Sequence, residues 1–517
     1  MSGAVNQNPS LKGLAQNVKP TFEKLFRLLF PFDFLKDVIL KQTNKKMMED
    51  KETVALTIGE LLRYLGLWFY MSSMTFDSRR DFWSSENSTM FEGCPVRLNE
   101  WMSRRRFEAI TRCLQLTDDN APIYQDKFWE VRAVLTAWNE NMKDAFTPGW
   151  ISCLDESMSK WLNEYTCPGF MCVPRKPLPL GNEYHTIACG ISGVLYSLKI
   201  VEGKDEPQQR PRKEFEGLGK TVGLLLRLTR SLWGTGKAIV LDSGFCVLQG
   251  LVELRKKGVF AAALIKKRRY WPKYIDGDGI RNHFQDKPVG SVDVLCGELD
   301  SVKVYVHAMK EPDYVMMLMS TYGTTNEMGV EQKRILADNS RTTFHYPELV
   351  YNHFQYRDAV DSHNSSRMYP LALEETWKTT RWPLRVFQFL LAVTEVNCRL
   401  VFESLCGGER MSQQQFRRQF AKELILNSDL LSAPLTMRAS KRKTVDRSAH
   451  ELLPLSPFRN FKNGRVVRGK TRSVQRKCFC SARRVNTYCK CSPGLFLCGS
   501  CFSEHVAECV TGGQLVD

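Results

Sequence analysis

Three aspartates occupy positions where a metal-assisted reaction would use them. Asp155 and Asp242 each follow a short apolar run that is typical of a strand, and open α/β sheets bind ligands beyond the carboxyl ends of their strands. Asp361, in the segment AVDSHN, is the candidate for a third carboxylate. Two Mg²⁺ ions held by such oxygens activate a water or a 3′-hydroxyl and stabilise the oxygen that leaves a phosphodiester. The plainer alternative is that an aspartate at a strand end is a turn or cap residue.

Glu156 competes with Asp155 for the metal because the two residues are neighbours. Successive side chains of a strand point to opposite faces, so one of the two can face the site. We favour Asp155, and we expect its replacement by asparagine to abolish Mg²⁺-dependent cleavage.

A second group of metal ligands gathers near the C-terminus, where seven of the seventeen cysteines lie between positions 478 and 509. The candidate zinc ligands are Cys478, Cys480, Cys489, Cys491, Cys498, Cys501, His505 and Cys509. Eight such ligands supply two tetrahedral Zn²⁺ sites, and a segment so poor in apolar residues needs such cross-links to fold. Two partitions are open. In the sequential one, the first four and the last four ligands bind one ion each; in a cross-brace, the pairs at 478/480 and 498/501 share an ion.

Basic residues are concentrated in one segment. The chain has 73 Lys and Arg against 56 Asp and Glu, a net charge of +17, which favours a polyanionic partner such as nucleic acid. Between positions 438 and 477, thirteen basic residues accompany two acidic ones. We interpret this segment as a linker that contacts DNA phosphates, as a nuclear import signal around Lys441, Arg442 and Lys443, or as both.

A shorter basic run interleaves positive charge with aromatic rings. It consists of Lys266, Lys267, Arg268, Arg269, Tyr270 and Trp271. Such a run suits phosphate contact and base stacking in a DNA-binding surface. The alternative is a solvated strand end.

Length and composition restrict the class of protein. The chain has 517 residues, of which 43% are hydrophobic and 25% charged, which excludes a mostly disordered chain, a collagen-like repeat and a coiled coil. No apolar segment reaches the length of a membrane span, and the polar first residues do not resemble a secretory signal. We therefore expect a reducing compartment, in which the terminal cysteines bind metal rather than form disulfides.

The segments that must position these residues differ in periodicity. After a flexible stretch at 1–20, helical spacing over 21–146 predicts a helical domain for dimerisation or DNA binding, with Thr57 and Glu60 as a capping box. Short strands, the first at 150–154, alternate with helices over 147–265 and predict a mixed α/β catalytic core. The remaining segments are a β-rich insertion at 266–350, a second part of the core with its following helices at 351–437, a basic linker at 438–477 and the cysteine-rich zinc domain at 478–517.

The order and spacing of several motifs resemble the piggyBac-family DNA transposases and the transposase-derived proteins of that family. The resemblance covers roughly residues 20–405 and returns in the cysteine-rich tail. It is carried by LTIGELLRYLGLWFYM (56–71), MSRRRFEAITRCLQL (102–116), TPGWISCLDESMSKW (147–161), KAIVLDSGFCVLQGLVELRKKGVFAAALIKKRR (237–269), VDSHN (360–364) and TTRWPLR (379–385).

The resemblance implies a ribonuclease-H-like core whose catalytic aspartates map onto Asp155, Asp242 and Asp361, with a β-rich insertion between the second and the third. It places Trp382, in the family's Arg-Trp-Pro motif, near the active site and the DNA. It favours the cross-braced partition in the terminal zinc domain, although CxC spacing replaces CxxC here. Many members carry a fourth aspartate three residues after the third, where this chain has Asn364.

The resemblance further implies cut-and-paste transposition of double-stranded DNA in the nucleus. One strand is hydrolysed at each transposon end, the freed 3′-hydroxyl attacks the opposite strand to form a hairpin, and the element is joined to a TTAA target. At least a homodimer is expected because two ends need two active sites, and neither a membrane nor a small-molecule substrate is expected. The alternatives are a domesticated, non-catalytic DNA- or chromatin-binding protein on the same fold and, from the tail, a RING-type ubiquitin ligase.

Overall fold

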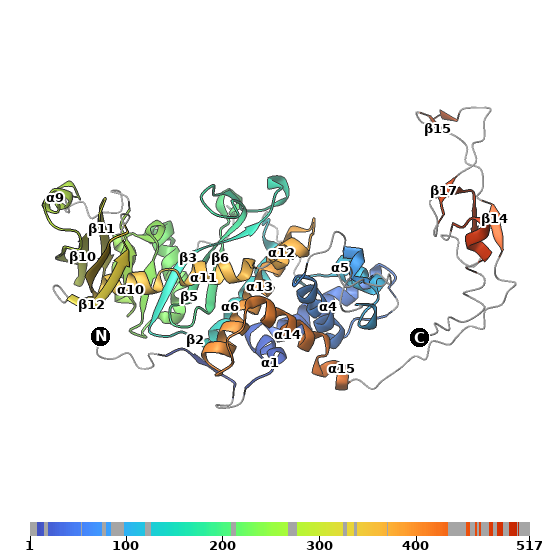
Figure 1. Ribbon diagram of the computed structural model, residues 1–517, viewed down its shortest axis with the longest axis horizontal. Helices are drawn as coiled ribbons and strands as arrows, with labels where there is room; N and C mark the ends of the chain where they lie inside the picture. Colours follow the sequence, from blue (N-terminus) through green and yellow to red (C-terminus); the bar gives the residue numbers. More distant parts are fainter. Residues whose placement is uncertain are drawn as a thin grey trace. The chain divides into compact units, whose positions relative to one another are not determined.

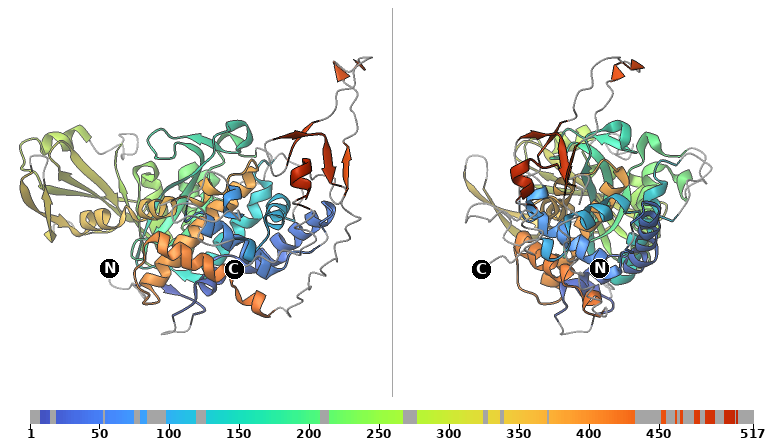
Figure 2. Two further views of the ribbon diagram at one scale, coloured as in Figure 1. Left: turned by 45° about the vertical axis from the view of Figure 1, so that its right-hand side comes forward. Right: turned by 90° about the vertical axis from the view of Figure 1, so that its right-hand side faces the viewer.

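The computed structural model divides the chain into two compact units, residues 1–433 and 434–517. In the first unit it describes residues 8–14, 19–52, 54–74, 79–83, 98–118, 126–207, 214–266, 277–323, 328–335, 339–369 and 371–432. In the second unit it describes residues 451–454, 461–462, 465–466, 475–478, 483–489, 496–503 and 505. Figure 1 and Figure 2 show the helices and strands of each unit.

The first unit contains both helices and strands. Its helices are α1 (Phe22–Leu29), α2 (Phe32–Phe34), α3 (Lys41–Glu49), α4 (Ile58–Met71), α5 (Arg104–Cys113), α6 (Trp129–Ala145), α7 (Lys220–Leu228), α8 (Leu248–Lys256), α9 (Gly277–His283), α10 (Glu348–Tyr356), α11 (Ala359–Met368), α12 (Leu373–Thr376), α13 (Trp382–Ser404), α14 (Gln413–Ile425) and α15 (Ser428–Ser432). Its strands are β1 (Ser10–Leu11), β2 (Phe146–Thr147), β3 (Ile151–Lys160), β4 (Phe170–Cys172), β5 (Leu180–Cys189), β6 (Leu195–Ile200), β7 (Ala238–Leu241), β8 (Phe260–Leu264), β9 (Val292–Leu299), β10 (Val302–Lys310), β11 (Val315–Ser320), β12 (Met328–Ile335) and β13 (Arg341–Pro347). None of the described helices combines the length and the apolar character needed to cross a bilayer.

A mixed sheet of nine described strands organises this unit (Figure 1). Its order is β4-β5-β3-β7-β8-β11-β10-β9, and β6 also pairs with β5. Strands β3, β7 and β8 are parallel, whereas β5 is antiparallel to both β3 and β6. The order β6-β5-β3-β7-β8, with helices α7 and α8 in the connections around β7, is consistent with a ribonuclease-H-like core.

Strands from the segment 266–350 extend this sheet. β11 pairs antiparallel with β8, and β10 and β9 follow it outward. The remaining strands of the segment, β12 and β13, form a separate hairpin. The edge of β8 therefore has its backbone groups paired rather than exposed, which removes an open edge beside the core.

Strand β3 is longer than its sequence suggested. We expected a strand at 150–154 that ends at Asp155, but β3 runs from Ile151 to Lys160. Its parallel pairing with β7 stops at Leu154, whereas its antiparallel pairing with β5 continues to Lys160. Asp155 therefore lies within a strand, at the point where one of its two neighbouring strands ends.

Helices cover both faces of the sheet. On one face, Ile151 and Val240 form a cluster with Leu349 and Val350 of α10. On the other, Leu154 and Leu241 belong to the large core that also contains the leucines of α7 and α8. The first face holds Cys153 and Asp155, because alternate residues of a strand share a face. Asp155 is thus directed towards the layer of α10 and α11.

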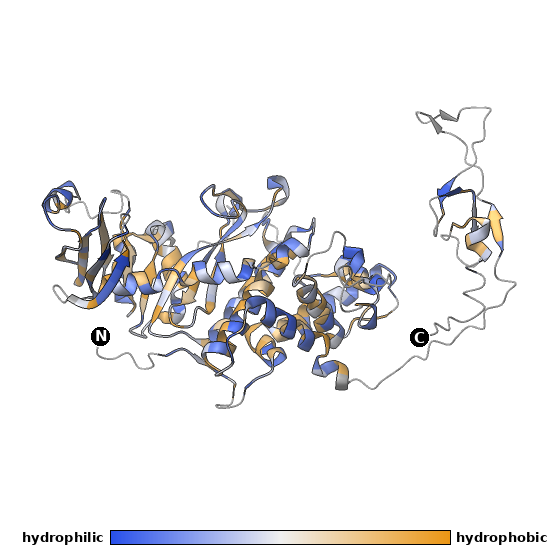
Figure 3. Cartoon of the chain, in the orientation of Figure 1, coloured by the Kyte–Doolittle hydropathy of each residue, from blue (hydrophilic) through white to orange (hydrophobic). Residues whose placement is uncertain are grey.

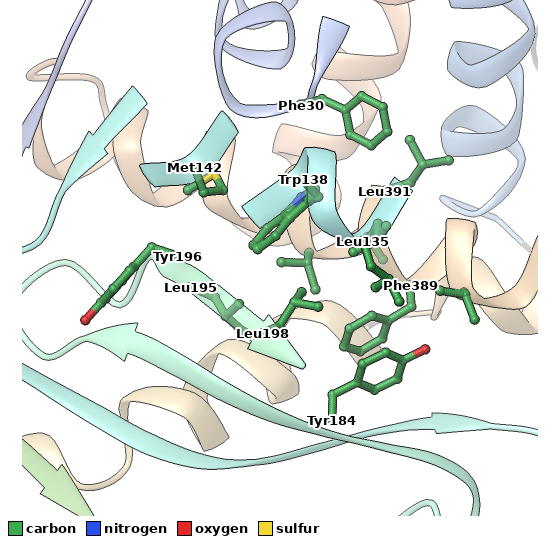
Figure 4. Close-up of a cluster of buried hydrophobic side chains, with 14 of the residues drawn as sticks. Phe30, Leu135, Trp138, Met142, Tyr184, Leu195, Tyr196, Leu198, Phe389 and Leu391 are labelled. Atoms are coloured by element: carbon green, nitrogen blue, oxygen red, sulfur yellow. The ribbon is translucent and has the colours of Figure 1, made fainter. Parts of the chain in front are cut away.

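The long helix α13 is the centre of the main hydrophobic core. It contacts α1, α6, α11, α12, α14 and β3, and almost all of its residues are buried. Figure 4 shows part of this core, in which the rings of Tyr184 on β5 and Phe389 on α13 lie face to face with centroids 4.0 Å apart. In Figure 3 the outlying helices α5 and α9 are mainly hydrophilic.

The second unit has little regular structure among its described residues. Its short strands are β14 (Leu452–Pro454), β15 (Phe461–Lys462), β16 (Arg465–Val466), β17 (Arg476–Lys477), β18 (Arg484–Val485) and β19 (Thr487–Cys489). β14, from the segment that we interpreted as a linker, pairs with β19 of the cysteine-rich tail. Its buried cluster consists of Cys478, Val485, Cys489, Leu497 and Cys501. Among the described residues of this unit, three of the five members of the cluster are cysteines.

Candidate active site

Asp155 and Asp242 lie side by side where the parallel strands end. Leu154 pairs with Leu241 across β3 and β7, and the amide of Asp242 donates to the carbonyl oxygen of Leu154 (3.3 Å). The next residue on each strand is an aspartate, and both face the helices α10 and α11. On the other side of β3, the hydroxyl of Thr186 donates to the carbonyl oxygen of Asp155 (3.1 Å), so β5 fixes the backbone at this position.

Helix α11 brings the third aspartate to the same place. Asp361 lies in the first turn of α11 and is exposed. The start of this helix is fixed on the sheet: Val360 packs against Cys153 and Ala188, and the Cys153 thiol donates to the carbonyl oxygen of Arg357 (2.9 Å). Because Cys153 and Asp155 share a face of β3, Asp361 lies above Asp155.

The middle of α11 is tied to the backbone of β3. Arg367, which is fully buried, donates to the carbonyl oxygen of Met158 (2.6 Å) and forms an ion pair with Glu374. The side-chain amide of Asn364 donates weakly to the carbonyl oxygen of Glu156 (3.4 Å). These contacts set the height and rotation of the helix over the strand, and therefore the direction of Asp361.

The carboxyl of Asp155 has an unusual proton affinity. Burial raises its pKa to about 7, and the negative charges of Asp361 and Asp242 add to the rise. Lys176 and a hydrogen bond from the amide of Glu156 oppose the shift. The mutual repulsion is an electrostatic sign that the three carboxylates occupy one site.

Asp242 is shifted in the opposite direction. Burial favours its neutral form, but hydrogen bonds from the amides of Ser243 and Gly244 and the positive charge of Lys266 hold the pKa of Asp242 below its usual range. The Lys266 ammonium nitrogen is 3.8 Å from the Asp242 carboxylate. The site therefore contains one firmly ionised carboxylate beside one that titrates near neutral pH.

The donors present suit a hard divalent cation. Carboxylate oxygens are preferred ligands of Mg²⁺, and a cation relieves the repulsion that raises the pKa of Asp155. Asn364 supplies a further observation, because its side-chain oxygen is buried and accepts no hydrogen bond from the described residues. The oxygens of the three aspartates do not all lie within 4.8 Å of one another.

Glu156 faces a different environment from Asp155. Its carboxylate is 3.3 Å from the Arg175 guanidinium and 3.8 Å from the Lys176 ammonium. Strand alternation directs it away from α11, as our preference for Asp155 assumed. Arg175 and Lys176 could not be predicted from the sequence, because they lie in a proline-containing loop and only the pairing of β5 with β3 brings them here.

The residues predicted to contact DNA are only partly described. Lys266 lies beside Asp242 and is exposed. Trp382 is buried, with 5% of its surface exposed, and its indole N–H donates to the side-chain oxygen of Asn182 (2.7 Å). The structure therefore places Trp382 in the interior rather than on a surface that DNA can reach. Six predicted contacts lie outside the described residues: Lys267, Arg268, Arg269, Lys441, Arg442 and Lys443.

Three of the predicted zinc ligands form a cluster. The sulfur atoms of Cys478, Cys498 and Cys501 lie within 4.8 Å of one another, and this is the group of metal-binding type found in the described part of the chain. Their crowding raises the pKa of Cys501 to about 12, chiefly through its contact with Cys498. Cys489 is buried, but its sulfur atom does not belong to this group of three. The ring of His505, which is among the described residues, does not belong to it either. Cys480, Cys491 and Cys509 lie outside the described residues.

Comparison with known proteins gives the class of this chain. The family model described as Transposase IS4 matches residues 23–398. Human PiggyBac transposable element-derived protein 3 is 22% identical over 304 residues, which cover 57% of this chain and 49% of that protein. Human PiggyBac transposable element-derived protein 2 is 24% identical over 334 residues, which cover 63% of this chain and 52% of that protein. The chain thus spans about half the length of these relatives.

The fold has a match among solved structures. The cryo-EM structure of a piggyBac transposase synaptic complex with hairpin DNA has a TM-score of 0.63 and 17% sequence identity, and the match covers 83% of this chain and 86% of that chain. At this identity the likeness concerns the fold. Because the family match spans most of the chain, the protein belongs to the Transposase IS4 family. The relatives and the solved structure that the chain is similar to are piggyBac-type proteins, in agreement with the resemblance of its motifs.

Proposed function

We propose that this protein is a DNA transposase that cleaves and joins phosphodiesters with Asp155, Asp242 and Asp361. The observation that supports the proposal is the placement of these residues: Asp155 on β3 and Asp242 after β7 follow paired residues, and Asp361 lies in the first turn of α11, which packs on β3. The shift in the pKa of Asp155, to which both other aspartates contribute, supports it.

In such a reaction different residues of the chain would bind the metal ions and the phosphodiester. Asp155, Asp242 and Asp361 would hold the cations. The side-chain oxygen of Asn364, which accepts no hydrogen bond from the described residues, would be an uncharged ligand. Bound Mg²⁺ supplies an activated oxygen nucleophile and neutralises the charge that develops on the phosphate. Lys266, next to Asp242, offers a positive charge to the phosphodiester. The anchored start of α11 keeps the carboxylates in place without large reorganisation.

The finer steps of the proposal come from the family. They are cut-and-paste excision through hairpin formation, insertion at TTAA, action as at least a homodimer and a location in the nucleus. The solved structural match is a piggyBac synaptic complex with hairpin DNA, which supports DNA ends as substrate. The excess of basic residues supports a polyanionic partner.

For the tail we propose two Zn²⁺ ions in the cross-braced partition. Cys478 lies with Cys498 and Cys501, although twenty residues separate them, whereas a sequential partition requires Cys478 to join Cys489. Cys480 then completes the first site. The second site takes Cys489, Cys491, His505 and Cys509, and each site has the four ligands of a structural zinc.

The test is cleavage of duplex DNA that carries the sequences flanking the gene for this chain as candidate ends. In Mg²⁺, the wild-type chain should cut at the ends, and Asp155→Asn, Asp242→Asn and Asp361→Asn should each lower the rate by about a thousandfold, because each removes a charged ligand. Asp358→Asn is the matched control. Asp358 is an exposed N-cap residue one turn before Asp361, and its variant should cut at the wild-type rate. Normal cleavage by any of the first three variants removes that residue from the site.

A second function is favoured by two observations. The curated relatives are transposable element-derived proteins, and Asn364 stands where many family members have a further aspartate. If the protein is a domesticated DNA-binding protein, the wild-type chain should bind the same DNA ends and leave them uncut at every Mg²⁺ concentration. The cleavage assay with a parallel binding measurement separates this outcome from transposition.

A further inference from the structure

A cavity of about 870 Å³ lies next to the aspartates. It is bounded by the end of β8, by α9, by the turn between β10 and β11 and by the connection from α10 to α11. Lys266 lines the cavity, and its ammonium nitrogen is also 3.8 Å from the Asp242 carboxylate. The cavity therefore adjoins Asp242. The volume is in the range of about 300–1,000 Å³ that is typical of pockets for small ligands. It is large enough for a few nucleotides of one strand.

The lining of this cavity is basic. Its cations are Lys266, Arg281, Lys310 and Arg357, and its carboxylates are Asp278 and Asp313. Lys266 and Arg357 are near carboxylates of their own, Asp242 at 3.8 Å and Asp358 at 3.4 Å. Neither Arg281 nor Lys310 takes part in an ion pair within the described part of the chain. Two positive charges without a protein partner are therefore available to bind phosphate.

The same cavity offers a surface for a base. Tyr314, in the turn between β10 and β11, lines the cavity and is 60% exposed. An exposed aromatic ring beside cations is typical of surfaces that bind single strands, because bases stack on the ring while phosphates contact the cations. Leu264 and Val315 line the cavity as well and add an apolar surface.

We infer that this cavity binds an unpaired stretch of the DNA strand next to the phosphodiester held at Asp155 and Asp242. Arg281 and Lys310 contact its phosphates, and Tyr314 stacks on one of its bases. A paired base cannot stack in this way, since both of its faces are covered within the duplex. The inference rests on the proposed function for the identity of the ligand, and it assigns three residues that the family's aspartate motif does not include.

The test compares two DNA probes bound to the full chain in the absence of Mg²⁺, by fluorescence anisotropy. One probe is a blunt duplex, and the other is the same duplex with a short single-stranded extension. The wild-type chain should bind the extended probe about tenfold more tightly, the scale expected for stacking of a single base. The double variant Arg281→Ala/Lys310→Ala and the variant Tyr314→Ala should lose this preference and keep their affinity for the blunt duplex.

Lys303→Ala is the matched control, because Lys303 is an exposed lysine on β10 that does not line the cavity. It should keep the preference. Equal loss of affinity for both probes in the cavity variants, or no preference in the wild-type chain, overturns the inference. Competition by free dAMP as strong as that by the extended strand also overturns it, because the ligand is then a mononucleotide.

The outcome is independent of catalysis. A chain that prefers the extended probe but never cuts DNA in Mg²⁺ contradicts the proposed function and leaves the cavity assignment standing. A chain that cuts DNA ends without this preference supports the proposed function and contradicts the cavity assignment.

Discussion

Asp155 and Asp242 follow Leu154 and Leu241, which pair across the neighbouring strands β3 and β7. Their surroundings nevertheless shift their pKa values in opposite directions. Asp155 is buried beside two other carboxylates, and its pKa rises from 3.8 to about 7. Asp242 has hydrogen bonds from two amides and a nearby ammonium group, and its pKa falls. The difference is one of environment, not of residue type. It leads to two predictions at the scale of single residues.

The first concerns metal affinity. A carboxyl must lose its proton to bind a cation, so the affinity for Mn²⁺ should rise about tenfold between about pH 6 and pH 8, a window that spans the raised pKa of Asp155. Isothermal titration calorimetry in two buffers of different ionisation enthalpy measures both the affinity and the released proton. The Asp155→Asn variant should bind more weakly and lose this dependence on pH. A wild-type affinity that does not change with pH contradicts the assignment.

The second concerns the stability of the metal-free protein. Between about pH 4 and pH 7, folded Asp155 holds a proton that the unfolded chain has released. The native state therefore binds more protons, and its free energy of unfolding falls as the pH rises through this window. Urea unfolding at several pH values should show a shallower fall in Asp155→Asn. If the free energy of unfolding changes with pH in the same way in both proteins, the raised pKa of Asp155 is contradicted.

Helix α11 is the element on which the site depends. Its buried Arg367 joins the Glu374 carboxylate to the carbonyl oxygen of Met158 on β3. Removing one partner of a buried pair leaves the other charge uncompensated. Arg367→Met should therefore lower the free energy of unfolding by about 3–5 kcal/mol, as measured in urea. Lys256→Met breaks exposed pairs with Glu253 and Asp300 and should cost less than about 1 kcal/mol; similar losses for both variants would show that Arg367 is not an anchor.

The elements differed in how far the sequence predicted them. The run Ala238–Leu241 matches β7, because a strand buried on both faces consists of apolar residues only. Strand β3 exceeded its prediction, since the polar residues after Asp155 join it through pairing with a distant segment, β5. Thr57 caps α4 as predicted, but the Glu60 carboxylate binds Arg106 instead of closing a capping box. Tertiary partners of this kind leave no local signal.

In the candidate site, too, sequence motifs were predictable and tertiary contacts were not. Motif order singled out the three aspartates, and the structure places Asp155 on β3, Asp242 after β7 and Asp361 in the first turn of α11; their catalytic role stays a prediction. Burial was harder to foresee: Trp382 belongs to a DNA-contact motif by resemblance, yet it lies inside the protein. The cations of the cavity come from the end of β8, from α9, from β10 and from the residues after α10, and among them only Lys266 belongs to a basic run that the sequence singled out.

At the scale of the whole molecule, the two units depend on different forces. The first has an extensive apolar core, whereas the described residues of the second include a buried cluster of five, three of them cysteines. If the tail binds zinc as proposed, metal binding would contribute much of the folding free energy of the second unit. Treatment with a zinc chelator should make residues 434–517 sensitive to protease while residues 1–433 remain intact, as followed by mass spectrometry. Equal resistance of the tail with and without chelator contradicts a zinc-dependent fold.

The position of divalent ions in a crystal of the full chain tests the central claim most directly. Mn²⁺ can be located by its anomalous scattering after crystals are soaked in it. We expect anomalous peaks bounded by the carboxylates of Asp155, Asp242 and Asp361, with Asn364 alongside. Ordered Mn²⁺ bound elsewhere, with these three carboxylates left without an ion, would contradict it.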